Sequence, residues 1–154
     1  MKRVSLLLVV VFALGCLLPV ARAGMVGQKL PKAYLNYLGT KPDLEGKPLL
    51  LEFWATWCPP CRQSIPHLNE IYAKYKDRGL MIVGVTDEPD GVIRKFQKDL
   101  PMDYAVATDT GGRLSNEMGI QGIPHAFLVN KSGEIVWDGH PMQLTDEDIE
   151  KILE

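Results

Sequence analysis

Two cysteines that flank two prolines are the part of this sequence best suited to do chemistry. Cys58 and Cys61 enclose Pro59 and Pro60, and the pair directly follows an apolar run. A cysteine at the start of a helix lies at the positive end of the helix dipole, which favours thiolate over thiol. The thiolate is the species that attacks a disulfide. The spacing therefore predicts a redox pair with Cys58 as the exposed nucleophile and Cys61 as the shielded resolving thiol.

The two prolines between the cysteines limit how strongly the thiolate can be stabilised. Neither Pro59 nor Pro60 has a backbone N–H that could donate to the sulfur of Cys58. The amide and thiol of Cys61 are the remaining local donors, and no histidine lies between the cysteines. Since strong oxidants owe their potential to a stabilised reduced form, this composition favours a reducing couple.

Glu52 is an acid inside the apolar run that precedes the cysteines. Burial of an ionised carboxylate is costly, so we expect its pKa to be raised. A strand beneath the start of the helix would bring this carboxyl close to Cys61, where it could accept the proton that Cys61 loses during resolution. The alternative is a solvent-facing position on an edge strand.

A proline at position 124 precedes a predicted strand, where proline cannot donate to the ladder. A cis bond would expose the backbone of Ile123 for pairing with an extended substrate segment beside the sulfurs. The alternative is an ordinary turn proline. Of the two tryptophans near the cysteines, Trp57 is expected at the docking surface and Trp54 in the core.

Strands and helices alternate around these residues. The apolar and amphipathic patterns predict strands at 49–55, 80–86, 104–107, 126–129 and 135–137. They predict helices at 59–78, 91–100, 111–118 and 146–153, and an irregular segment at 24–48. This order predicts an α/β fold with three layers, α/β/α, and a mixed central sheet.

The first 23 residues have the pattern of a secretory signal peptide. A positive start is followed by an apolar run over 4–18 and by Ala-Arg-Ala at 21–23. We expect cleavage after Ala23, a single mature domain at 24–154, and export to the periplasm. The alternatives are an uncleaved leader that acts as a membrane anchor and lipidation of Cys16. The apolar run of about 15 residues is shorter than the ~20 that span a bilayer.

The net charge of the chain limits the classes of partner that it can be expected to bind. The formal net charge of −2 over 154 residues gives no basic patch, so nucleic acid is not expected as a partner. Loss of the leader removes three basic residues and no acidic ones, which takes the charge to −5. This charge argues against adhesion to an anionic membrane, and no stable membrane insertion is expected after cleavage. Export places the remaining cysteine pair in an oxidising compartment, where it can cycle.

The run EFWATWCPPC at 52–61 and the Gly-Ile-Pro at 122–124 resemble the thioredoxin superfamily. The leader, FWATW at 53–57 and an extra helical segment near 90–100 are similar to its exported TlpA, ResA and CcmG branch. The resemblance implies a thioredoxin fold with a helical insertion and thiol–disulfide exchange with exported proteins. It also implies recharging by a membrane or periplasmic electron donor, and no cofactor. The expected catalytic residues are Cys58, Cys61 and Glu52. The expected substrate-binding residues are Trp57, Pro59, Pro60, Ile123, Pro124 and Gly139.

Two other functions use the same cysteines. A module that delivers a metal such as copper would bind it through the two cysteines together with His67, His125 or His140. Two cysteines lack the four-ligand spacing of a structural zinc site. No metal site is therefore expected. A thiol peroxidase would need a threonine three residues before the nucleophile, whereas Thr56 stands two before Cys58. The acidic clusters at 87–90 and 146–148 are expected to be a solvated loop and a helix N-terminus.

Overall fold

The computed structural model describes residues 24–154; the expected leader, with Cys16, lies outside the described residues. The strands are β1 (Asn36–Tyr37), β2 (Leu49–Phe53), β3 (Met81–Thr86), β4 (Ala105–Thr108), β5 (His125–Val129) and β6 (Ile135–Gly139). The α-helices are α1 (Pro59–Tyr75), α2 (Asp90–Phe96), α3 (Arg113–Glu117) and α4 (Asp146–Leu153). Short 3-10 turns follow at Lys76–Arg78 and Pro141–Gln143.

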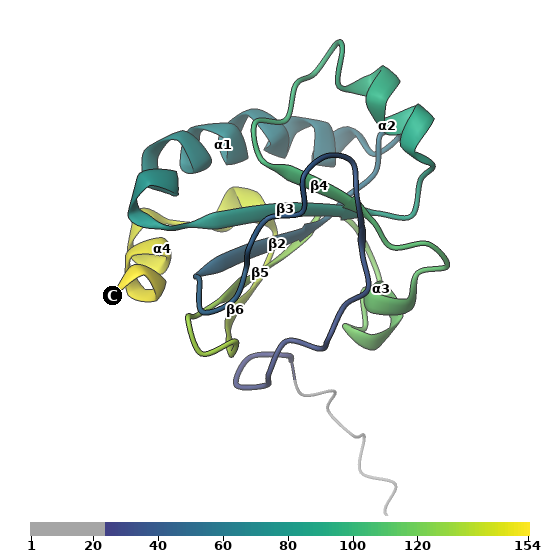
Figure 1. Ribbon diagram of the computed structural model, residues 1–154. Coiled ribbons are helices and arrows are strands. Elements are labelled where there is room, and N and C mark those ends of the chain that lie inside the picture. The colour runs from purple at the N-terminus through teal and green to yellow at the C-terminus, as the bar shows by residue number, and fades with distance from the viewer. Residues whose placement is uncertain (1–23) are drawn as a thin grey trace, which may run out of the picture.

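The described strands form a mixed sheet in the order β1-β4-β3-β2-β5-β6 (Figure 1). The central strand β2 runs parallel to β3 and antiparallel to β5. Each of its residues is buried, as expected for a strand that is covered on both faces. The predicted mixed sheet is therefore confirmed, and Glu52 lies on a central strand rather than at a solvent-facing edge.

The alternation of side chains along β2 divides the core between the two faces of the sheet. Leu50 packs with residues of α1 and α4 in one apolar cluster. Leu49, Leu51 and Phe53 pack on the other face against α3 and the segment 25–44. Because side chains alternate along a strand, Glu52 shares the face of Leu50 and points toward α1. The three-layer arrangement is confirmed, although irregular chain supplies much of the second outer layer.

Local signals explain where the helix that carries the cysteines begins and ends. Cys58 is the N-cap of α1, and Pro59 and Pro60 occupy its first positions, where a missing N–H costs no helical hydrogen bond. The helix passes into the turn Lys76–Arg78, which ends at Gly79 in the left-handed region with φ 98°. The predicted helix over 59–78 is confirmed.

Several expected elements differ from the structure. The strand expected at 49–55 ends at Phe53, and the strand expected at 135–137 extends to Gly139. The segment 24–48, expected to be irregular, contains β1, which pairs antiparallel with β4. The helix expected at 91–100 is shorter, since α2 ends at Phe96 and turns follow at 97–99. Pro101 disfavours helical geometry at Leu100, so the helix could not have reached that residue. The helix expected at 111–118 begins only at Arg113, because both preceding glycines have positive φ.

The N-terminal end of the described chain belongs to the folded body. Met25 and Leu30 pack in the same apolar cluster as Phe53. The N–H of Gly27 donates to the carbonyl oxygen of Ile135 at 2.8 Å. Gly24 and Met25 also line a cavity of about 540 Å³ together with the loop 119–122. None of the helices within 24–154 has the length and apolar character needed to cross a bilayer.

Gly84 leaves the space that Trp54 occupies, and this gives a stability prediction. A Cβ at Gly84 would lie 3.0 Å from Nε1 of Trp54 and 3.1 Å from Cε of Met102. We expect Gly84→Ala to lower the free energy of unfolding by about 1–3 kcal/mol, as overpacking in a core does. Thermal or urea unfolding measures it. Gly39→Ala is the matched control, since a Cβ there meets no atom within 4 Å. Equal stability of the two variants would contradict the prediction.

Candidate active site

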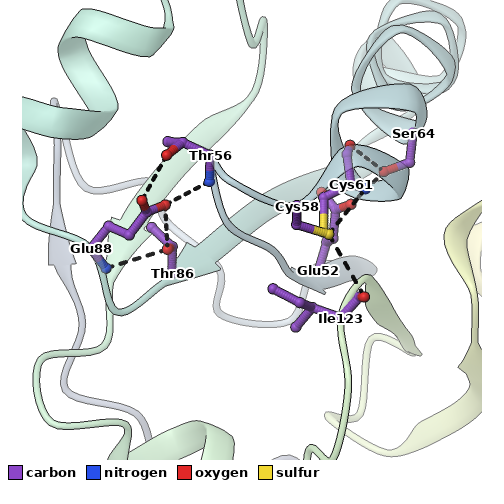
Figure 2. The surroundings of a disulfide bond; sticks show 8 residues. All are labelled: Glu52, Thr56, Cys58, Cys61, Ser64, Thr86, Glu88 and Ile123. Atoms are coloured by element: carbon purple, nitrogen blue, oxygen red, sulfur yellow. Dashed lines mark hydrogen bonds between the residues drawn. A yellow bond between two sulfur atoms is a disulfide. The ribbon is translucent and has the colours of Figure 1, made fainter.

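The two cysteines form a disulfide at the N-terminus of α1, with the Sγ atoms 2.10 Å apart (Figure 2). The N–H of Cys61 donates to Sγ of Cys58 at 3.3 Å. The prolines between them carry no N–H, so the Cys61 amide is the donor that the local backbone offers to this sulfur. The predicted donor is therefore confirmed.

The expectation that Cys58 is exposed is wrong in this oxidised state. Cys58 is 3% exposed and Cys61 is 0% exposed. Sγ of Cys58 faces the loop before β5, 3.7 Å from the carbonyl oxygen of Ile123. Cys58 also packs with Trp54 and Ile65 in an apolar cluster. The loop at Ile123, which is distant in the sequence, covers the sulfur. The position of Cys58 at the start of a helix does not by itself predict this burial.

Glu52 is fully buried and connects to the disulfide through a serine of α1. Oγ of Ser64 lies 2.9 Å from Oε1 of Glu52 and 2.8 Å from the carbonyl oxygen of Cys61 (Figure 2). A hydroxyl carries one proton, so it can donate to only one of these two oxygens at a time. Both contacts are satisfied when Glu52 is protonated. The carboxyl then donates to Oγ of Ser64, and the Ser64 hydroxyl donates to the carbonyl oxygen of Cys61.

The pKa of Glu52 agrees with this protonated arrangement. Burial raises it to about 8, more than the opposing hydrogen bonds from Ser64 and Tyr104 lower it. The hydroxyl of Tyr104 donates to Oε2 of Glu52 at 3.3 Å. Burial of the phenol raises the pKa of Tyr104 well above its ordinary value, and the neighbouring Glu52 carboxyl adds to this rise. At neutral pH the carboxyl therefore holds a proton for most of the time.

The loop before β5 supplies the opposite wall of the site. The Ile123–Pro124 peptide bond is cis, as expected. Trp57 is 69% exposed beside the disulfide, whereas Trp54 is 2% exposed, which matches the surface and core positions expected for them. A cavity of about 260 Å³ opens between Trp57, Phe53 and Ile123.

The other expected substrate-binding residues lie at different distances from the sulfurs. Pro59 and Pro60 are exposed at the first turn of α1, whereas Pro124 is buried. Gly139 pairs with Ala126 on the far side of β5 from Glu52. A Cβ at Gly139 would lie 3.0 Å from the Trp137 ring, so packing explains this glycine. Its place in a substrate groove stays a prediction.

The family model described as AhpC/TSA family matches residues 26–138. The chain belongs to the AhpC/TSA family. A curated relative, thiol-disulfide oxidoreductase ResA of Bacillus thuringiensis subsp. konkukian (strain 97-27), is 34% identical over 133 residues, which cover 83% of this chain and 76% of the relative. ResA of Halalkalibacterium halodurans is 34% identical over 113 residues, 73% of this chain and 64% of that protein.

Solved structures agree on the fold. One described as the thiol:disulfide interchange protein DsbE from Chlorobium tepidum matches with a TM-score of 0.78 and 30% identity, and covers 86% of this chain and 100% of that chain. StoA from Bacillus subtilis matches with a TM-score of 0.60 and 29% identity over 71% of this chain and 84% of its own. This AhpC/TSA family member therefore has a thioredoxin fold and is a protein disulfide oxidoreductase.

The contact between Glu88 and Thr56 in this oxidoreductase could not be predicted from the sequence. The acidic cluster at 87–90 was expected to be a solvated loop, but Glu88 is half-buried and bonded to Thr56, 32 residues away. A separation of that length has no local pattern, so the sequence carried no signal for this pair. Asp146, in the other acidic cluster, does lie in the first turn of a helix, as expected.

The three histidines do not gather at the cysteine pair. His125 begins β5, His140 follows β6, and His67 is half-buried on α1, where a surface position was expected. Within residues 24–154, no group of three or more His, Cys, Asp or Glu side chains lies close enough together to hold a metal ion.

Proposed function

We propose that this oxidoreductase reduces disulfides in exported proteins, with Cys58 as the nucleophile and Cys61 as the resolving thiol. The observation that carries the proposal is the Cys58–Cys61 disulfide at the start of α1, where the Cys61 N–H faces Sγ of Cys58. The helix dipole and this N–H favour thiolate at Cys58 once the disulfide is reduced.

The exchange proceeds in two steps. The Cys58 thiolate attacks one sulfur of a substrate cystine, which forms a mixed disulfide and releases the other substrate sulfur as a thiolate. The Cys61 thiolate then attacks Sγ of Cys58, which frees the second substrate thiolate and forms the Cys58–Cys61 disulfide. The substrate gains two electrons. A membrane or periplasmic donor must return them before the next cycle.

Glu52 takes the proton that Cys61 loses before resolution. Ser64 bridges this carboxyl to the backbone of Cys61, so the acid lies within one residue of the reacting turn. A base must be ionised to accept a proton, and with a pKa of about 8 Glu52 is ionised in only a minority of molecules at pH 7. A buried group with a pKa near the working pH suits general acid–base exchange.

The surroundings of the sulfurs supply the docking surface. Trp57 with Pro59 and Pro60 offers an exposed apolar rim. Across the disulfide, the backbone of Ile123, held by Pro124, offers an edge for an extended substrate segment. Gly139 completes this set at the end of β6.

The proposed export of this protein supports exported proteins as its substrates. The proposed signal peptide at 1–23, cleaved after Ala23, would deliver the domain 24–154 to the periplasm. An uncleaved leader or lipidated Cys16 would instead hold it at the membrane. N-terminal sequencing of the protein from the cell envelope separates these outcomes, because cleavage leaves Gly24 as the first residue.

The reducing direction gives a measurable prediction. Because the Cys61 amide is the only backbone donor that the Pro-Pro turn leaves to the thiolate, we expect a potential near the roughly −270 mV of thioredoxin, far from the roughly −120 mV of a strong oxidant. Equilibration with glutathione or dithiothreitol buffers, read by thiol labelling, measures it. A potential in the oxidant range contradicts the reducing function. Tight stoichiometric copper binding by the reduced protein, with no reduction of insulin disulfides, contradicts disulfide exchange altogether.

A further inference from the structure

Glu88 joins two loops beside the disulfide through both of its carboxylate oxygens. The N–H of Thr56 donates to Oε2 at 2.6 Å, and the hydroxyl of Thr56 donates to Oε1 at 2.7 Å. Figure 2 shows Glu88 on one side of the loop through Thr56, with the disulfide and Glu52 on the other side. Hydrogen bonds to a charged carboxylate are stronger than those between neutral groups.

The bonded residue lies at the turn that carries the chain from β2 into α1. The N–H of Cys58 donates to the carbonyl oxygen of Ala55 at 3.2 Å, so Thr56 and Trp57 are the central residues of this turn. In the described part of the chain, the Glu88 carboxylate is the acceptor for the Thr56 N–H. Nothing within the turn itself replaces this contact. Trp57, at 69% exposure, depends on the turn for its position.

Glu88 is itself held to the sheet. Its N–H donates to Oγ1 of Thr86 at 3.3 Å, and that hydroxyl lies 3.4 Å from Oε2 of the carboxylate. Thr86 is the last residue of β3 and is 3% exposed. The turn that presents Cys58 is thus tied to the end of β3 as well as to β2.

We propose that Glu88 is a positioning residue for thiol–disulfide exchange, which acts by holding the Thr56–Trp57 turn so that Cys58 keeps its place as the cap of α1. This inference rests on the proposed function. When the carboxylate is removed, the turn loosens and the contact between the Cys61 N–H and Sγ of Cys58 weakens. The reduced protein then holds less thiolate at a given pH, and Trp57 no longer presents a fixed surface.

The test compares three variants with the wild type. Glu88→Ala removes both contacts. Glu88→Gln keeps an acceptor for the Thr56 N–H and can donate to the Thr56 hydroxyl, so it preserves the clamp without its charge. Asp90→Ala is the control, since it removes an exposed carboxylate two residues further along the chain, at the first position of α2, and within 24–154 that side chain has no described hydrogen bond.

Three measurements are made on each protein: the rate of insulin reduction, the pH profile of alkylation of reduced Cys58, and the melting temperature. We expect Glu88→Ala to reduce insulin about tenfold more slowly, since small misplacements of reacting groups are costly, and its alkylation profile to shift to higher pH. Glu88→Gln should restore most of both properties, and Asp90→Ala should match the wild type.

The outcomes separate this inference from the function on which it rests. A wild-type rate and profile for Glu88→Ala overturn the positioning role, as does a Glu88→Gln variant that is as impaired as Glu88→Ala. A slower Glu88→Ala with an unmoved profile and a lowered melting temperature shows a structural role only, and also overturns it. If the wild type does not reduce insulin, the proposed function fails, while the alkylation profiles still decide what Glu88 does.

Discussion

Replacement of Cys58 by serine should abolish disulfide reduction, with a loss of roughly a thousandfold or more, because a serine hydroxyl does not provide the thiolate that exchange requires. Replacement of Cys61 should act differently. Cys61→Ser keeps the nucleophile but removes the resolving thiol, so the reaction should stop at a mixed disulfide on Cys58. The two variants therefore differ in where the reaction stops.

Reaction of the reduced proteins with DTNB measures this difference. The wild type should release thionitrobenzoate twice, first on attack by Cys58 and then on resolution by Cys61. Cys61→Ser should release one equivalent rapidly and retain the other. Cys58→Ser should react slowly, because the thiol that remains is not the N-cap of α1 and is completely buried. A Cys58→Ser variant that reacts as fast as the wild type would reverse the assigned roles. So would alkylation of the reduced wild type that labels Cys61 first.

Glu52→Gln should separate the chemistry of the carboxyl from its contribution to stability. The amide keeps the size of the side chain and can still bond to Ser64, but it cannot accept a proton from Cys61. We expect roughly tenfold slower resolution at pH 7, less than the ~10²-fold or more that general bases typically contribute, because few of the carboxyls are ionised there. In the wild type the rate should rise up to about pH 8, the pKa of Glu52, and then level off. The variant should lack this rise.

Glu52 should also make the stability of the oxidised protein depend on pH. The free energy of unfolding should fall as the pH rises, whereas the rate of resolution should rise. The folded pKa of about 8 lies above the ordinary value of 4.5. Below pH 4.5 both states hold the proton, so the buried acid carries no ionisation penalty. As the pH rises toward 8, the unfolded chain releases a proton that the folded chain retains, so folding becomes less favourable, by roughly 4–5 kcal/mol in total. Above about pH 8 the loss levels off.

Glu52→Gln has no proton to lose, so it should become more stable than the wild type as the pH rises from 4 to 9. Urea unfolding at a series of pH values measures this difference. Glu70→Gln is the control, since it removes an exposed carboxyl from α1. If the wild type and Glu52→Gln change in parallel across this range, the raised pKa is contradicted.

Local sequence signals predicted the fold well wherever the residues that determine an element lie within that element. The last helix begins where Thr145 and Asp148 form a capping box, and its predicted bounds, 146–153, match α4. The apolar run indicated a strand covered on both faces, expected at 49–55 and found at Leu49–Phe53, and its one acid is buried as expected. The helix start at Pro59 follows from proline's tolerance for the first turn.

Features that depend on distant segments could not be predicted in this way. The two-residue strand β1 exists because it pairs with β4, and its own sequence has no strand period. Cys58 is buried because the loop at Ile123 lies over its sulfur, 65 residues further along the chain. Glu88 reaches Thr56 across 32 residues, so its neighbours in the sequence suggested only a solvated loop. Each of these contacts is decided by topology.

The packing of the first described residues has a consequence for a tethered form of the protein. Met25 is partly buried and packs against the core, and Gly24 shares a cavity with the loop 119–122, next to Ile123. If the leader stayed in the bilayer, only residues 19–23 would separate its apolar run from the domain, a reach of about 17 Å at most. The face near Ile123 would then stay close to the lipid headgroups, which would restrict approach by large, rigid clients. Release from the leader would leave that face open to clients of any size.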